Sequence, residues 1–150
     1  MTVEEVDVLN VRVLSIIRNA NPTRLVVFSG NGYTPLDALL AATIPDKNDP
    51  YLIANFHNYD PWPFAGQCLQ SWGSEQDHAI LASIYQRAKD WSVMHNIPLM
   101  VNEFGAAKYD FTTPENTCDQ VIKFGYSFPD DFEKVVRIFT LCFSDTLNDL

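Results

Sequence analysis

The chain has 150 residues, of which 47 % are hydrophobic and 19 % are charged, and its formal net charge at pH 7 is −9. This length allows one domain with a sizeable core, and the composition is that of a globular chain and not of a disordered one. The negative charge argues against nucleic acid or an anionic membrane as a partner, because both would repel the chain. No apolar run approaches the roughly 20 residues that a membrane span needs.

The first element expected is a helix. Thr2 and Glu5 have the spacing of a capping box at a helix N-terminus. The helix should end near Ala20, because Asn21 precedes a proline and is pushed out of the helical conformation. Its buried face is expected to carry the apolar residues that recur at helical spacing, namely Val6, Leu9, Val13, Ile16 and Ile17.

Two extended runs follow this helix. RLVVFSG, residues 24–30, is an apolar run closed by a glycine, which is typical of a strand covered on both faces. Residues 31–50 form a long polar connection, in which LDALLAA suggests a short helix. YLIANFHNY, residues 51–59, is the second extended run, and the Pro-, Gly- and Trp-rich loop DPWPFAGQCLQSWG comes after it.

A second long helix precedes the third extended run. It should begin at Ser74, with Asp77 three residues on, and end at HNIP. PLMVNEF, residues 98–104, is the third strand. The order helix, strand, helix, strand, helix, strand predicts parallel strands and an α/β fold. The residues expected on the buried side of this helix are Ile80, Leu81, Ile84, Ala88 and Trp91.

The regular pattern weakens after Tyr109. FTTPENTCDQ, residues 111–120, is typical of a loop, and a helix is expected from about Pro129 to Phe143. VIKFGYSF is a weak candidate for a further strand. We therefore divide the chain into a unit at residues 1–108 and a divergent, helical tail at residues 109–150.

Polar side chains stand where two of the expected strands end. His57 and Tyr59 close the second strand, two positions apart and therefore on the same face, and Glu103 closes the third. Ligands of parallel α/β sheets gather at these carboxyl ends, so the three residues could form part of an active site. Each also has a structural interpretation, since a strand-end histidine is often a satisfied structural residue and a strand-end glutamate a solvated carboxylate or a helix cap.

Several stretches resemble the C-terminal half of family 5 glycoside hydrolases, the cellulase or endoglucanase type of (β/α)8 barrel. They cover roughly residues 3–108, in the order and spacing of the family. By this resemblance the three extended runs are barrel strands five, six and seven. The resembling stretches are NVRVLSIIRNANPTRLVVFSGNGY, IANFHNYDPWPFAGQ, WGSEQDHAILASIYQRAKDW and IPLMVNEFGA.

The resemblance implies roles for the strand-end residues. Such enzymes use two carboxylates and retain the anomeric configuration. Glu103 in Asn-Glu-Phe-Gly matches the nucleophile, and Tyr59 matches the tyrosine that orients this carboxylate by a hydrogen bond. His57 matches the histidine that helps to position the sugar. Trp62 and Trp72 could stack on sugar faces, although packing roles in the loop are at least as frequent for such residues.

The chain also departs from the family pattern. The family's acid/base glutamate belongs to an Asn-Glu-Pro motif at the end of strand four, which is not found here, and Glu4 and Glu5 in the first helical turn cannot replace it. The eighth strand is not recognisable in the tail. We therefore expect a partial barrel, very slow hydrolysis by this chain alone, and self-association through open sheet edges.

Two alternative functions remain at this point. One is a catalytically inactive α/β fragment that binds carbohydrate through His57, Tyr59 and the tryptophans; the other is a small α/β domain whose resemblance is accidental. The sequence contains no phosphate-binding glycine loop, no His-Glu-x-x-His and no Gly-x-Ser-x-Gly, and its three cysteines form no Cys-x-x-Cys pair, so no cofactor and no metal site are expected. The expected partner is a poly- or oligosaccharide. The family resemblance also implies an extracellular location, although the acidic first residues, MTVEEVDVLN, lack the charge pattern of a signal peptide.

Overall fold

The computed structural model describes residues 1–67, 69–70, 73–105, 109–110 and 113–117. Its main feature is a parallel sheet of three strands in the order β1-β2-β3, which confirms the predicted α/β class. The strands of this sheet are β1 (Val26–Ser29), β2 (Leu52–Asn58) and β3 (Leu99–Phe104). The helices are α1 (Val3–Ala20), α2 (Leu36–Ala41), α3 (Trp62–Ala65) and α4 (Glu75–His95).

The long helices begin where their caps predict. In α1, the Thr2 hydroxyl accepts from the Glu5 N–H at 3.2 Å and the Glu5 carboxylate accepts from the Thr2 N–H at 2.9 Å, which completes the capping box. Ser74 and Asp77 form the same reciprocal pair at the start of α4. This helix ends at Asn96, whose left-handed conformation (φ 53°) is a frequent helix stop.

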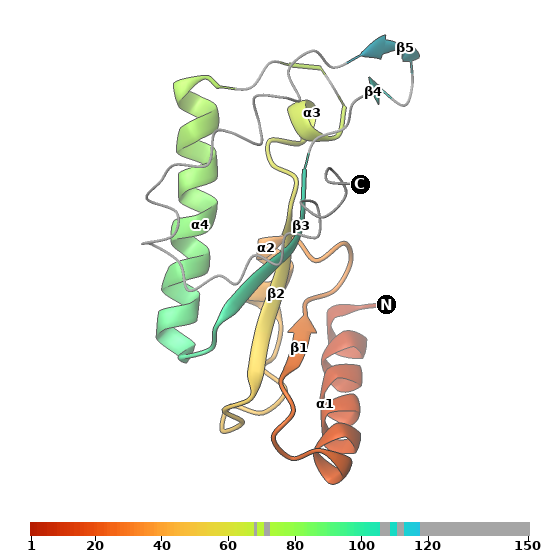
Figure 1. The fold of residues 1–150 in the computed structure, drawn as a ribbon, viewed down its shortest axis with the longest axis vertical. Helices are drawn as coiled ribbons and strands as arrows, with labels where there is room; N and C mark the ends of the chain where they lie inside the picture. The colour runs from red at the N-terminus through yellow and green to blue at the C-terminus, as the bar shows by residue number, and fades with distance from the viewer. Residues whose placement is uncertain (68, 71–72, 106–108, 111–112, 118–150) are drawn as a thin grey trace, which may run out of the picture.

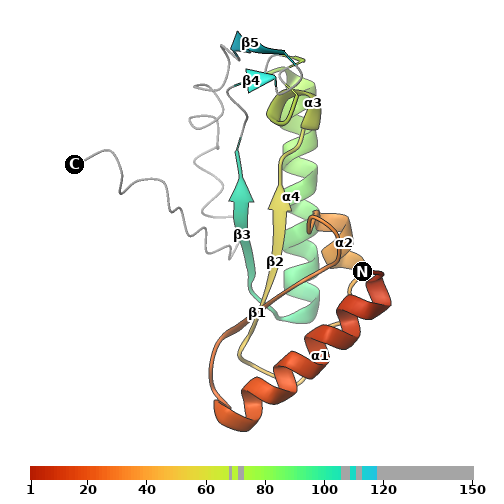
Figure 2. The same ribbon diagram turned by 90° about the vertical axis from the view of Figure 1, so that its right-hand side faces the viewer.

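The hydrophobic core lies between the sheet and its helices. Helix α2 packs on β2, α4 packs on β3, and the two helices also contact each other (Figure 1). Figure 2 shows α4 running behind β2 and β3, with α2 beside it. Burial of these apolar side chains is the main source of stability, at about 25 cal/mol per Å². The core residues with no exposed surface are Leu39, Ala54, Phe56, Ala88 and Leu99.

Two burial predictions are wrong. Within α1 the one buried residue is Leu14, whereas Ile16 of the predicted face is 70 % exposed. Helical periodicity shows that a helix has an apolar side, but it does not show that a neighbour covers that side. In β1, Phe28 is buried but Val27 is 44 % exposed, so the described part of the chain covers only one face of this strand.

A short antiparallel pair replaces part of the predicted loop after β3. It consists of β4 (Tyr109–Asp110) and β5 (Thr113–Thr117), and it lies with α3 beyond the carboxyl ends of β2 and β3 in both views (Figures 1 and 2). The expected helix at residues 129–143 and the candidate strand VIKFGYSF lie outside the described residues. None of the helices in the described ranges combines the length and the hydropathy that crossing a bilayer demands.

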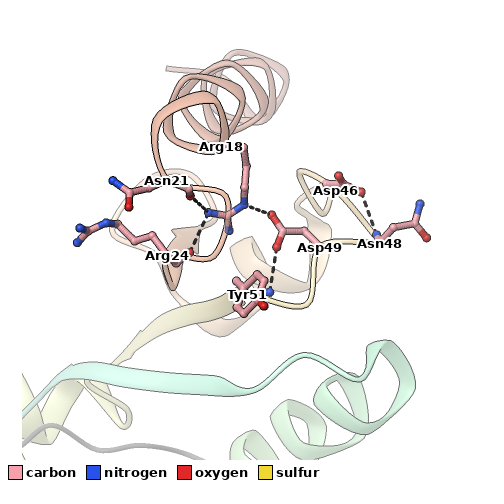
Figure 3. Close-up of polar contacts among 7 residues, drawn as sticks. All are labelled: Arg18, Asn21, Arg24, Asp46, Asn48, Asp49 and Tyr51. Carbon is pink, nitrogen blue, oxygen red and sulfur yellow. Dashed lines mark hydrogen bonds and ion pairs between the residues drawn. The ribbon is translucent and has the colours of Figure 1, made fainter.

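A buried ion pair closes the amino end of the sheet (Figure 3). Arg18, near the end of α1, places Nε 2.6 Å from Oδ2 of Asp49, and it also donates to the carbonyls of Asn21 and Arg24 at 3.3 and 2.8 Å. The other oxygen of Asp49 accepts from the Tyr51 N–H at 2.9 Å. The hydrogen bond from Arg18 lowers the pKa of Asp49. This cluster joins α1 to the start of both β1 and β2.

Candidate active site

The three predicted strand-end residues converge at the carboxyl end of the sheet. Nδ1 of His57, on β2, lies 3.1 Å from Oε2 of Glu103, on β3. The Tyr59 hydroxyl, just past the end of β2, donates to the same oxygen at 3.4 Å. The predicted proximity is therefore confirmed, whereas the catalytic roles remain predictions.

A bulge in β3 turns Glu103 toward His57. Leu99 and Val101 are buried on the helix-covered face, and strict alternation would place Glu103 on that face as well. The pairing changes register instead: Phe56 pairs with Val101, but His57 pairs with Glu103, so Asn102 is an extra residue. One extra residue moves the following side chain to the opposite face, and bulges of this kind occur next to active sites.

Hydrogen bonds on both sides hold the residues that face Glu103. The His57 N–H donates to the Thr34 carbonyl at 2.7 Å, which ties β2 to the loop after β1. Asn58 is buried, donates to the Tyr85 hydroxyl of α4 at 3.1 Å and accepts from the Asp60 N–H at 3.1 Å. Tyr59 thus lies within a turn that is braced from α4.

The Tyr59 hydroxyl is kept in its protonated form. Burial raises the pKa of Tyr59, and the negative charge of Glu103 and the hydrogen bond to it raise this pKa further. A tyrosine with a raised pKa donates a proton to the hydrogen bond throughout the neutral range. The side chain of Glu103 is 52 % exposed, so its carboxylate remains open to a ligand.

These residues line an open hollow of about 1300 Å³. Trp62, the first residue of α3, belongs to the lining and is 53 % exposed; one side of its indole packs against Gly66, where a Cβ atom would overlap the ring. Trp72 and the three cysteines lie outside the described residues or, for Cys68, in a gap between them. The described residues contain no group of three His, Cys, Asp or Glu side chains that could hold a metal ion.

The lining also contains residues that the sequence analysis did not select. Asn31 and Tyr33 come from the loop after β1, and Asp60 comes from the loop after β2. The rule that selected His57 and Glu103 applies equally to the end of the first strand, where NGY follows RLVVFSG. The signal was therefore present, but it was applied to two strands out of three.

Comparison with known proteins identifies the family. The model of the cellulase family, glycosyl hydrolase family 5, matches residues 1–126. The chain therefore belongs to glycosyl hydrolase family 5, as the resemblance predicted, and its fold is part of a (β/α)8 barrel. The match runs past residue 108, while the division of the chain at that point remains a prediction.

Individual relatives point to the same class. Endoglucanase H of Acetivibrio thermocellus is 38 % identical over 109 residues, which are 73 % of this chain and 12 % of that protein. A hyperthermophilic endo-β-1,4-glucanase solved with substrate has a TM-score of 0.76 at 19 % identity, over 93 % of this chain and 46 % of that one. Thermotoga maritima Cel5A, solved with mannotriose, has a TM-score of 0.72 at 22 % identity, over 82 % of this chain and 41 % of that one. The chain thus spans less than half the length of each of these proteins.

Proposed function

We propose that this chain carries the nucleophile half of a retaining endo-β-1,4-glycanase site, with Glu103 as the nucleophile. The observation that supports the proposal is the convergence of His57 and Tyr59 on one oxygen of an exposed carboxylate, at the sheet end where barrel enzymes bind substrate. In this proposal His57 and Tyr59 orient Glu103, and Trp62 contacts a sugar ring.

The proposed reaction begins with attack by the carboxylate. Both contacts fall on Oε2, so Oε1 of Glu103 is assigned the attack on the anomeric carbon. A bond forms between Oε1 and that carbon while the glycosidic C–O bond breaks, which gives a glycosyl-enzyme and a sugar alkoxide that takes a proton from a general acid. Water then hydrolyses the ester with retention of configuration.

The second carboxylate determines how fast this chain can act on natural substrate. The family's acid/base glutamate has no counterpart in the resembling stretches, so we infer that this chain alone hydrolyses glucan very slowly. An activated aryl leaving group departs without a proton, and it therefore tests the nucleophile separately.

The proposed substrate is a β-1,4-linked glucan of the cellulose type. The support is the 38 % identity to an endoglucanase, together with a structural neighbour that is an endo-β-1,4-glucanase. Another neighbour was solved with mannotriose, so a β-mannan is the competing substrate and serves as a comparison in the experiment.

Covalent trapping tests this proposal. 2,4-Dinitrophenyl 2-deoxy-2-fluoro-β-cellobioside should add one fluorocellobiosyl group to the wild-type chain, located on Glu103 by peptide mass spectrometry. Glu103→Gln should remove the label, whereas Glu4→Gln, an exposed glutamate on α1, should keep it. The matched fluoromannoside should label more slowly.

Two results would contradict the proposal. Labelling of the Glu103→Gln variant at the wild-type rate would show that another residue is the nucleophile. Binding of cello-oligosaccharides without any label would favour the carbohydrate-binding fragment that the sequence also allowed.

A further inference from the structure

A second aromatic residue stands at the hollow, apart from the cluster around Glu103. Tyr33 lies in the loop between β1 and α2, lines the same hollow as His57 and Trp62, and is 92 % exposed. A tyrosine this exposed contributes little to the core, since large aromatic side chains stabilise a fold mainly by being buried. Its position calls for another explanation.

The backbone around Tyr33 is held in a costly conformation. Both of its neighbours have positive φ angles, 65° at Gly32 and 57° at Thr34. This region is easy for glycine but strained for a β-branched residue such as threonine. Strained residues of this kind cluster at ligand-binding sites, where the surrounding structure holds them in place.

The surroundings of Thr34 hold the strained loop. Thr34 is buried, its N–H donates to the Asn31 carbonyl at 3.2 Å, and its carbonyl accepts from the His57 N–H at 2.7 Å. Pro35 forms a bridge with His57 as well. The loop that presents Tyr33 is therefore attached to the same strand residue that contacts Glu103.

We propose that Tyr33 is a sugar-stacking residue that binds a second unit of the substrate, away from the unit attacked by Glu103. The inference rests on the proposed function. The hydroxyl groups of a β-1,4-linked glucan are equatorial, so each ring has apolar C–H faces that can pack on an aromatic side chain.

The strand order sets which sugar Tyr33 contacts. Glu103 ends β3 and Tyr33 follows β1, and these strands are separated by β2. Two strand spacings amount to roughly 10 Å, which exceeds the width of one sugar ring. Tyr33 should therefore affect the binding of long oligosaccharides and not that of short ones held at Glu103.

Calorimetric titration of the full chain with cellotetraose and cellobiose tests the inference. Tyr33→Ala should weaken cellotetraose binding by about two- to tenfold, the range for a lost aromatic contact, and leave cellobiose binding unchanged. Tyr33→Phe keeps the ring and should bind both sugars like the wild type. Met94→Ala, which removes an exposed side chain from α4, is the matched control and should change neither affinity.

Three outcomes would overturn the inference. They are an unchanged cellotetraose affinity in Tyr33→Ala, an equal loss for both sugars, and a wild-type chain that binds neither sugar. The fluoroglycoside label on Glu103 is measured separately. A labelled Glu103 with no effect of Tyr33→Ala would reject the role of Tyr33 alone, whereas an unlabelled Glu103 would reject the proposed function.

Discussion

The two ends of the sheet carry the same kind of interaction in opposite states. At the amino end, Asp49 is bound on both oxygens, by Arg18 at 2.6 Å and by the Tyr51 N–H at 2.9 Å, and its side chain is 5 % exposed. At the carboxyl end, Glu103 is contacted on one oxygen, at 3.1 and 3.4 Å, and about half of its side chain is exposed. One carboxylate is fully occupied and the other is held but open.

This difference separates stability from chemistry. A carboxylate buried with a guanidinium and an N–H can only hold the chain together, because nothing else can reach it. A carboxylate oriented from one side and open on the other can contact a ligand. The same division of a barrel, with function at the carboxyl ends and stability at the amino ends, is general for this fold.

Deletion of Asn102 should have the largest effect on the carboxyl end. Without the extra residue, strict alternation turns Glu103 toward α4 and away from His57, so labelling by the fluoroglycoside should fall to background. Asn102→Ala keeps the residue count and should retain the label. If the deletion variant is labelled as well as Asn102→Ala, the bulge does not set the direction of Glu103.

Arg18→Ala should have the largest effect on the amino end. It leaves the Asp49 carboxylate buried without its main partner, so the free energy of unfolding in urea should fall by roughly 2–4 kcal/mol. Arg12→Ala, at an exposed position of the same helix, should change it by less than about 0.5 kcal/mol. Equal losses in both variants would show that the ion pair contributes nothing specific.

The stabilisation by Asp49 should also depend on pH. Its pKa is lowered in the folded chain, so its contribution is complete above the ordinary aspartate value of about 3.9 and is lost as the pH falls through the lowered value. The difference in unfolding free energy between wild type and Arg18→Ala should therefore narrow below about pH 4. A difference that is constant down to pH 2 would contradict this account.

Tyr59→Phe should have the smallest effect. It removes one long hydrogen bond to a half-exposed carboxylate, so the labelling rate should fall by about fivefold, equivalent to about 1 kcal/mol, with unchanged unfolding in urea. Because the pKa of Tyr59 is raised, the wild type should keep this advantage up to about pH 10. A Tyr59→Phe variant that labels at the wild-type rate would remove Tyr59 from the proposed site.

The sequence predicted the elements that have local causes. The capping boxes of α1 and α4 and the apolar runs of the three strands depend on residues within a few positions of each other, and each was found where expected. The convergence of His57 and Tyr59 on Glu103 was also predicted, because parallel strands bring their carboxyl ends together.

What the sequence did not predict depends on contacts between distant segments. The bulge at Asn102 arises from the pairing of β3 with β2, and no local pattern marks it. The exposure of Val27 and Ile16 depends on what covers β1 and α1. The β4–β5 pair has a polar sequence, TPENT, that is more typical of a loop than of a strand.

Chemical rescue tests the role of Glu103 most directly. With 2,4-dinitrophenyl β-cellobioside and azide, the Glu103→Ala variant should form α-cellobiosyl azide, because azide enters the space of the missing carboxylate and attacks from the face opposite the leaving group. The anomeric coupling in the proton NMR spectrum of the product identifies it. Formation of the β-azide, or no azide product under conditions in which the variant is folded, would contradict the assignment of Glu103 as the nucleophile.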